Sequence, residues 1–290
     1  MFHDIGVVAR PDRKKALDLA MNLVTHLENK GLNVLLEPKL AQYANQPNAS
    51  LPLEKMKTDL IITVGGDGTV LRTCLLIPKP EPPILAINMG VRGFLTEVPP
   101  ILGIEALDEC LTGKFKLETC VKLASFIGGI RQPDALNDVF VSGPLAKTLY
   151  TQIIKNGEFV ARCQSDGVVV ASQVGSTGYS LSGGGPVLDP EVNAFVLTPI
   201  CPITGFHPIV FSTKSTIEIE ILKPKVATVV IDGHYQTEIG PQHPRITIKK
   251  SRHVTSFVRL KGNFYRRLND RLLLYKGGPF NIDEKENTHS

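Results

Sequence analysis

In the first third of the chain, short continuous apolar runs alternate with segments whose apolar residues recur at helical spacing. The apolar runs predict strands at residues 4–9, 32–36, 59–64 and 84–88. The helical spacing predicts helices at residues 13–30, 69–77 and 104–111. Strands of continuous Ile, Leu and Val are buried on both faces, which is typical of a parallel sheet covered by helices. Residues 1–115 are therefore predicted to form an α/β domain with a Rossmann-like parallel sheet.

From residue 116 onward the pattern changes to strand-like runs with few helical stretches between them. Asn156-Gly157 separates two such runs and predicts a hairpin turn. Residues 216–222 alternate Ile with Glu, which is typical of a half-buried strand. The other predicted strands are 116–127, 136–142, 149–155, 158–163, 167–171, 226–231, 246–250 and 254–260. This pattern predicts a β-rich, sandwich-like second domain over residues 116–262.

The remaining C-terminal residues are predicted to add one helix and a tail. Residues 263–275 predict a closing helix, which we expect to pack back on the first domain. Residues 277–290 are polar and are expected to form a loose tail. Two domains also agree with a length of 290 residues, because single cores tend to split beyond about 250 residues.

Composition excludes several classes of protein. A hydrophobic fraction of 42% with 21% charged residues is not the composition of a disordered chain. The net charge of +4 is small and the Lys and Arg residues are scattered, which argues against nucleic-acid binding. No apolar run approaches the ~18 residues of a membrane helix, and the N-terminus lacks a signal-peptide pattern. Five cysteines without a C-x-x-C pair indicate neither disulfides nor zinc. We expect a cytoplasmic protein that does not bind membranes.

The segment Val64-Gly65-Gly66-Asp67-Gly68-Thr69 follows a predicted strand and opens a predicted helix. Its glycines allow a sharp turn that presents backbone N–H groups to a phosphate. Such turns also occur without a ligand, but Asp67 favours a functional reading. A carboxylate among phosphate-facing glycines repels phosphate unless it binds a metal or accepts a proton from a substrate hydroxyl. The segment matches neither the P-loop nor the G-x-G-x-x-G pattern.

Two further segments carry polar groups suited to a nucleotide. Residues 164–186 run from a strand into a stretch rich in hydroxyls and glycines, with no charge between Asp166 and Asp189. An uncharged polar loop of this kind is better suited to lining a nucleotide site than to facing water. Asn137-Asp138, at the start of an apolar strand, can read ribose or adenine groups, although a simple polar strand start is the commoner meaning of such a pair.

Four motifs together resemble the NAD kinase family, over roughly residues 5–260. They are residues 65–69, Ile87-Asn88-Met89-Gly90-Val91-Arg92-Gly93-Phe94-Leu95-Thr96, residues 166–186, and Leu197-Thr198-Pro199-Ile200-Cys201-Pro202. Diacylglycerol, sphingosine and phosphofructo-kinases share the first motif. The resemblance implies an α/β domain followed by a β-sandwich-like domain, with the site between them. It also implies ATP-dependent phosphorylation of the adenosine-ribose 2′-hydroxyl of NAD to give NADP, a divalent metal such as Mg²⁺, and a homo-oligomer, either a dimer or a tetramer.

The resemblance also implies roles for individual residues. Asp67 is the expected general base, and no residue is assigned as a metal ligand. The residues expected to bind NAD or ATP are Gly68, Arg72, Asn137, Asp138, Asp166, Thr177, Gly178, Tyr179, Ser180, Leu181 and Ser182. The chain departs from the family pattern at Asp138, where Glu is usual, and at Gly178, where Ala is usual. Gln164 replaces an Arg of some members. Asp232-Gly233-His234 resembles a late Asp-Gly-Gln element, which makes His234 a further candidate contact.

Two other functions compete with this hypothesis. A lipid kinase shares the motif around Asp67 but needs a membrane approach, and the sequence shows neither a basic amphipathic helix nor a lipid anchor. A non-catalytic dinucleotide-binding regulator would keep Asn137 and the loop 177–182 but would have no use for Asp67. Assaying ATP, Mg²⁺ and NAD for NADP formation separates the three.

Overall fold

The computed structural model describes residues 2–90, 93–144, 147–203, 205–260 and 264–272. Its α-helices are α1 (Lys14–Asn29), α2 (Pro38–Ala44), α3 (Asp67–Leu76), α4 (Gly103–Leu111), α5 (Tyr179–Ser182) and α6 (Phe264–Leu272). Short 3₁₀ turns are η1 (Pro47–Ala49), η2 (Leu53–Lys55), η3 (Pro100–Leu102) and η5 (Val174–Thr177). No helix in these ranges is long and apolar enough to cross a membrane.

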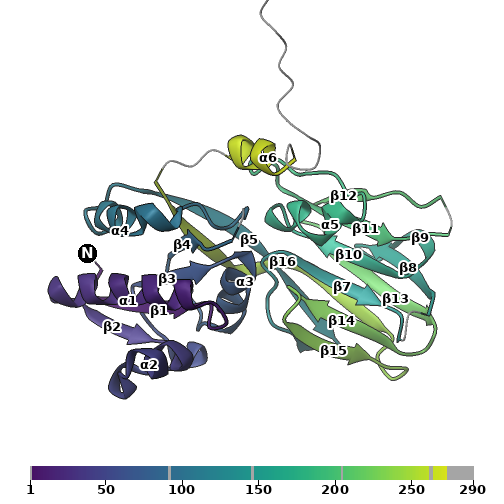
Figure 1. Ribbon diagram of the computed structural model, residues 1–290. Helices are drawn as coiled ribbons and strands as arrows, with labels where there is room; N and C mark the ends of the chain where they lie inside the picture. The colour runs from purple at the N-terminus through teal and green to yellow at the C-terminus, as the bar shows by residue number, and fades with distance from the viewer. Residues whose placement is uncertain (1, 91–92, 145–146, 204, 261–263, 273–290) are drawn as a thin grey trace, which may run out of the picture.

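The N-terminal half is built on four parallel strands, which lie in the order β2-β1-β3-β4 (Figure 1). Their bounds are β1 (Asp4–Ala9), β2 (Asn33–Leu36), β3 (Leu60–Gly65) and β4 (Ile84–Asn88). Side chains of β1 alternate between the two faces of the sheet. Val7 packs in one core with α1, α2 and α4, and Val8 packs in another core with α3. Both faces are covered, which explains why these strands are apolar throughout.

The same sheet continues into the C-terminal half in the order β4-β16-β13-β8-β9, with β5 paired to β16 and β6 paired to β5. The bounds are β5 (Lys116–Ile127), β6 (Ile130–Arg131), β8 (Leu149–Lys155), β9 (Glu158–Ser165), β13 (Ile217–Lys223) and β16 (Arg245–Arg259). The connection is the parallel pairing of Phe257 with Ile84. The sheet thus crosses the predicted boundary at residue 115, and the division into two domains stays a prediction.

A second sheet has six antiparallel strands in the order β12-β11-β10-β7-β14-β15. The bounds are β7 (Asp138–Ser142), β10 (Gly167–Ala171), β11 (Ala194–Ile200), β12 (Ile209–Ser212), β14 (Ala227–Ile231) and β15 (Tyr235–Ile239). Val168 and Val229 of this sheet share a buried core with Ile153 and Ile219 of the larger one. The C-terminal half is therefore a β-sandwich, and the predicted fold class is confirmed.

The sequence located most elements but misplaced some ends. Helix α3 begins at Asp67 rather than at residue 69, so the catalytic candidate occupies its first turn. The two strands predicted at 246–250 and 254–260 form the single strand β16, which has a register shift between Lys250 and Val254. The predicted helix at 263–275 is seen as α6, whereas the predicted tail 277–290 lies outside the described residues.

Candidate active site

The Gly-rich turn joins β3 to α3. Gly66 is extended and precedes the helix, and Asp67 is its first residue. A side chain on Gly65 would overlap Thr69 Oγ1 and Cβ, so the strand comes close to the first turn of α3 only because residue 65 lacks a Cβ. The turn therefore presents the N-terminus of a ten-residue helix, where backbone N–H groups attract anionic groups.

The Asp67 carboxylate is held by the segment that follows β4. Its Oδ2 accepts a hydrogen bond from the Phe94 N–H at 2.8 Å. Its Oδ1 accepts hydrogen bonds from the N–H groups of Leu95 at 3.2 Å and Thr96 at 3.3 Å, and from Thr96 Oγ1 at 3.3 Å. The first two motifs of the sequence therefore meet, and the second fixes the orientation of the carboxylate in the first.

A second carboxylate, the buried one of Asp232, holds the segment containing the Asn-Asp pair. It accepts hydrogen bonds from the backbone N–H groups of Leu136 at 2.7 Å, Asn137 at 2.8 Å and Asp138 at 3.0 Å. Asp232 lies in the turn between β14 and β15, and its φ of 49° is in the left-handed region. Asp232 is not among the site residues predicted from the sequence. Its signal was the Asp-Gly pair, which is typical of a tight turn.

The two side chains of the Asn-Asp pair differ in the hydrogen bonds that they can form with a ligand. Asn137 Oδ1 is buried and has no hydrogen-bond partner among the described residues, so it can accept a hydrogen bond from a ligand. Asp138 is 8% exposed, and burial, followed by the nearby Asp232 carboxylate, raises its pKa to about 7. A carboxyl group with such a pKa can donate a hydrogen bond when protonated and accept one when ionised.

The loop after β10 packs directly on this pair. Gly175 lies against the Asn137 backbone so closely that a Cβ would overlap its carbonyl. A Cβ on Gly178 would lie 3.4 Å from Asn137 Nδ2 and 3.7 Å from Asp138 Oδ2. Tyr179 is 43% exposed, and its ring makes an edge contact with Phe140 at a centroid distance of 5.1 Å. The predicted loop and the predicted Asn-Asp pair are thus brought together.

Several predicted binding residues have partners inside the protein. Ser180 is fully buried, and its hydroxyl lies 2.7 Å from Thr198 Oγ1. Thr177 Oγ1 donates to the Val174 carbonyl at 2.9 Å. Two of the four hydroxyl side chains in residues 177–182 therefore stabilise the loop itself, while Leu181 is half-buried and Ser182 is exposed.

Arg72 and Asp166 lie apart from the contacts described above. Both terminal nitrogens of Arg72 donate to the Glu37 carboxylate, at 2.5 and 2.8 Å, and this pairing raises the pKa of Arg72. Asp166 is exposed between β9 and β10, and its N–H donates to the Ile200 carbonyl at 2.9 Å. The roles of both residues stay predictions.

One contact joins the Gly-rich turn to the sandwich. His234 Nε2 donates to the Gly68 carbonyl at 3.0 Å. His234 lies two residues after Asp232, so the same turn holds the Asn-Asp pair and contacts the turn that carries Asp67. The family's Asp-Gly-Gln element was the signal for this residue in the sequence. The His234 contact therefore links the segment that carries Asp67 to the segment that carries the Asn-Asp pair.

Metal-ligating side chains do not gather in the part of the chain that the structure describes. No group of three or more His, Cys, Asp and Glu side chains within those ranges could hold a metal ion.

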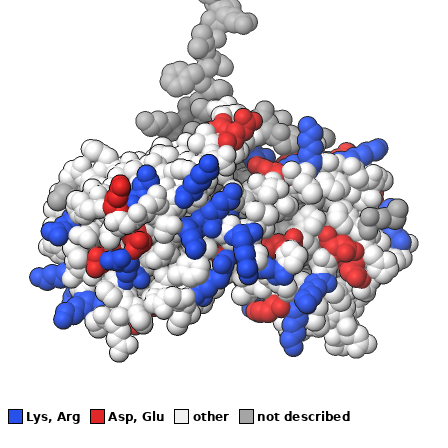
Figure 2. All heavy atoms as spheres, turned by 180° about the vertical axis from the view of Figure 1, so that it is seen from behind, with Lys and Arg blue, Asp and Glu red and all other residues white. Residues whose placement is uncertain are grey.

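Lys and Arg side chains that are scattered along the sequence gather on one face of the fold, in a band along the middle of the molecule (Figure 2). A local positive potential raises the association rate of anionic ligands such as nucleotides.

Known proteins support one family. Residues 5–115 match the family model of the ATP-NAD kinase N-terminal domain, and residues 136–260 match that of the C-terminal domain. A relative named NAD kinase from Methanothermobacter thermautotrophicus is 39% identical over 273 residues, which cover 93% of this chain and 96% of the relative. Another NAD kinase, from Thermococcus gammatolerans, is 39% identical over 275 residues, covering 92% and 98%.

Two solved structures are similar over almost the whole chain. Yeast NADH kinase complexed with NADH has a TM-score of 0.85 and 26% identity, and the match covers 97% of this chain and 89% of the yeast chain. An NAD kinase from Archaeoglobus fulgidus in complex with ATP has a TM-score of 0.75 and 29% identity, covering 93% and 98%. The chain is therefore a kinase, and it belongs to the NAD kinase family.

Proposed function

We propose that this protein transfers the γ-phosphate of ATP to the 2′-hydroxyl of the adenosine ribose of NAD, giving NADP and ADP, with Asp67 as the general base. The observation that carries the proposal is the fixed Asp67 carboxylate at the start of α3, which the His234–Gly68 contact joins to the turn that holds Asn137 and Asp138. The site thus combines a group that accepts a proton with groups that can recognise a nucleoside.

Phosphoryl transfer depends on positioning and charge stabilisation more than on covalent help from the protein. The 2′-hydroxyl oxygen forms a bond to the γ-phosphorus while the bond from that phosphorus to the ADP oxygen breaks. The hydroxyl proton passes to an Asp67 carboxylate oxygen, whose orientation the N–H groups of residues 94–96 maintain. The N–H groups of the Gly-rich turn stabilise the phosphate charge.

Mg²⁺ fits this site as an ion that arrives on the nucleotide. Mg²⁺ is commonly bound by one or two carboxylates together with substrate phosphates, rather than by a cage of protein ligands. Here Mg²⁺ would be held mainly by the phosphates of ATP, because the Asp67 oxygens already accept hydrogen bonds from residues 94–96 and one of them has to take the proton. Bound there, Mg²⁺ supplies charge neutralisation on the phosphates.

The Asn137–Asp138 pair and the loop after β10 bind NAD. The unpartnered Asn137 Oδ1 accepts from an N–H or O–H group of the dinucleotide, and Asp138 forms a second hydrogen bond. Gly178 leaves room beside this pair, and the exposed ring of Tyr179 offers a stacking surface. Gly68 lies along the nucleotide, and Asp166, Leu181 and Ser182 complete the proposed contacts. We also propose a cytoplasmic homo-oligomer, a dimer or a tetramer.

The test is to incubate the purified protein with ATP, Mg²⁺ and NAD, and to detect NADP with an NADP-specific dehydrogenase. In two parallel reactions, NADH or diacylglycerol takes the place of NAD. NADH is included because one of the similar structures is that of a yeast NADH kinase. NADP formation that requires both ATP and Mg²⁺ supports the proposal. Phosphorylation of diacylglycerol without NADP formation would show a lipid kinase, and NAD binding without turnover would show a non-catalytic regulator.

A further inference from the structure

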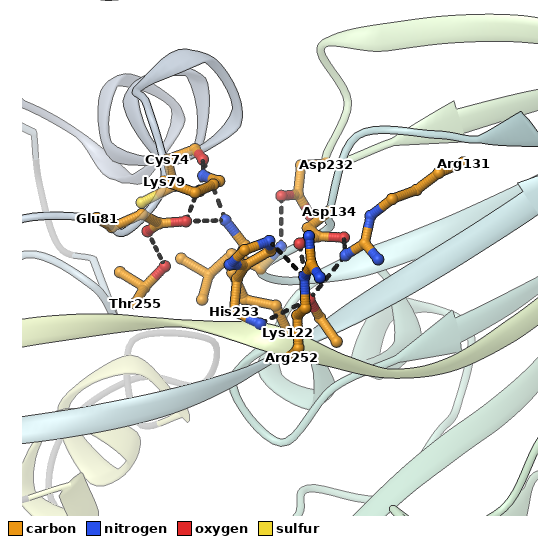
Figure 3. A network of polar contacts seen from close by, with 12 residues as sticks. Cys74, Lys79, Glu81, Lys122, Arg131, Asp134, Asp232, Arg252, His253 and Thr255 are labelled. Carbon is orange, nitrogen blue, oxygen red and sulfur yellow. Dashed lines mark hydrogen bonds and ion pairs between the residues drawn. The ribbon is translucent and has the colours of Figure 1, made fainter.

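A fully buried lysine lies behind the site. Lys122, on β5, has no exposed surface. Its ammonium donates to Glu81 Oε1 at 2.6 Å and to the Cys74 carbonyl at 3.0 Å (Figure 3). Cys74 lies near the C-terminal end of α3, the helix that begins at Asp67. A cation at a helix C-terminus stabilises that end of the helix, so Lys122 anchors α3 at the end opposite to Asp67.

The negative charge of Glu81 is shared between Lys122 and a second lysine. Lys79 Nζ also donates to Glu81 Oε1, and it donates to the Cys74 carbonyl at 2.8 Å. The other Glu81 oxygen accepts a hydrogen bond from Thr255. Two ammonium groups therefore face one carboxylate. They differ in burial, since the Lys79 side chain is 23% exposed and that of Lys122 is not exposed at all.

Asp232 adds a weaker negative charge near Lys122. Burial lowers the pKa of Lys122, but the charge of Glu81, then Cys74, the hydrogen bond to Glu81 and last Asp232 favour the ammonium and leave its pKa above the usual value. Burial raises the pKa of Asp232, while its three backbone N–H donors and Lys122 act against that rise. The backbone provides a direct link as well, because Leu123 and Ala135 exchange hydrogen bonds of 2.8 and 2.9 Å. Asp232 holds the next three residues after Ala135.

We propose that Lys122 is a positioning residue for NAD, and that it sets the place of the Asn137–Asp138 segment relative to Asp67. Its ammonium ties the far end of α3 to the strand beside residues 135–138 and offsets the Asp232 carboxylate that holds them. This inference rests on the proposed function and assigns Lys122 no contact with the substrate. A buried carboxylate that loses its compensating cation becomes costly to keep ionised, and Asp232 then holds the three N–H groups less firmly.

The test compares Lys122→Met with Lys79→Met, which makes the same substitution in a lysine that shares both acceptors. Kinetics with NAD and ATP separate KM from kcat, and calorimetry measures NAD binding directly. In Lys122→Met, KM and Kd for NAD are expected to rise about tenfold, within the range by which residues that contact neither ligand modulate the coupling between two sites. In that variant kcat at saturating NAD is expected to change less than about threefold, and in Lys79→Met the NAD affinity stays near wild type.

A double-mutant cycle with Asp232→Asn tests whether Lys122 acts through that carboxylate. The effect of Lys122→Met on NAD affinity is expected to shrink in the Asp232→Asn background, because no negative charge remains there to offset. Lys122→Arg, which keeps the charge, is expected to recover part of the affinity. If Lys122→Met does not fold, Lys122→Met/Glu81→Gln replaces both partners of the buried pair and allows the same comparison.

The outcomes separate this inference from the proposed function. Equal losses of NAD affinity in Lys122→Met and Lys79→Met, or fully additive effects in the cycle, would overturn the role of Lys122 while leaving NAD kinase activity standing. A wild-type protein that forms no NADP would overturn the proposed function instead.

Discussion

His234 and Gly68, which are 166 positions apart in the sequence, lie in direct contact: the imidazole Nε2 donates to the Gly68 carbonyl at 3.0 Å. This is a side-chain bond between the β14–β15 turn and the turn that carries Asp67. Asp232 in the same β14–β15 turn also binds the backbone of residues 136–138. A displacement of this turn would therefore move both the Asn137–Asp138 segment and the turn that carries Asp67.

Removing this contact is expected to weaken catalysis without unfolding the protein. His234→Ala loses one hydrogen bond worth about 1 kcal/mol, so kcat/KM for NAD is expected to fall about fivefold or more. His234→Gln keeps an N–H donor and is expected to retain more activity than His234→Ala. Steady-state kinetics of the two variants measure the difference. Equal activity in both would mean that the donor to Gly68 has no catalytic value.

Replacing Asp67 tests the general base. Asp67→Asn removes the proton acceptor, and kcat is expected to fall by a factor on the order of 10² to 10⁴, with NAD affinity largely intact. Thr96→Val is the matched control, because it removes one contact to the carboxylate but leaves the base. Its kcat is expected to fall less than about tenfold. Near-wild-type turnover by Asp67→Asn would end the assignment of Asp67 as the base.

The raised pKa of Asp138 is expected to make the stability of the protein depend on pH. This pKa is raised from 3.8 to about 7 in the folded protein, first by burial and then by Asp232. The folded state therefore binds more protons than the unfolded state between these two values, and the free energy of unfolding contributed by this group falls as pH rises through that window. Asp138→Asn removes the effect.

Thermal unfolding of wild type and Asp138→Asn at about pH 5 and about pH 8 measures this contribution. The Tm of the variant minus that of the wild type is expected to be more positive at the higher pH, where the wild type carries a buried negative charge. The same difference at both values would contradict a raised pKa for Asp138.

The cysteines are expected to differ sharply in reactivity. Burial raises the pKa of Cys74, Cys110 and Cys120 to about 12, and it also raises that of Cys163, whereas Cys201 is exposed. Since the thiolate is the reactive form, a thiol reagent is expected to modify about one cysteine per chain in the native protein and all five after unfolding. Cys201→Ser is expected to abolish the native reaction. Modification of a second cysteine in the folded protein would show that the core opens.

Elements whose structure is determined by local patterns could be predicted from the sequence. Apolar runs predicted β1 and β4 with their observed bounds, and the glycines around Asp67 marked the turn between β3 and α3. Local patterns could not predict that strands of the two predicted domains join in one sheet. It depends on the pairing of Phe257 with Ile84, and nothing in either local segment specifies a partner more than 170 residues away.

The site shows the same limit. Local patterns singled out Asp67 and the loop containing Tyr179, whereas Asn137 became a candidate only through the family resemblance, and the roles of all three stay predictions. Local patterns could not distinguish Ser180, whose hydroxyl faces Thr198 inside the fold, from hydroxyls that face a ligand. Nor could they show that Asp232 holds the Asn-Asp segment, because an Asp-Gly turn has the same appearance whether or not its carboxylate binds distant N–H groups.

Gly93 offers a test of the orientation of Asp67 that removes no catalytic group from the protein. A Cβ at residue 93 would overlap Asp67 Oδ1 and Thr96 Oγ1, so Gly93→Ala must displace the carboxylate or the segment that holds it. Gly90→Ala is the matched control in the same motif, since its Cβ would lie 3.4 Å from Asn88 Oδ1. We expect kcat to fall by on the order of 10²-fold in Gly93→Ala, as misplacement of a reacting group by about 1 Å does, and to change little in Gly90→Ala. Circular dichroism and Tm of both variants show whether the fold is kept. If folded Gly93→Ala retained wild-type kcat, the close packing of residues 93–96 on Asp67 would have no part in positioning the base.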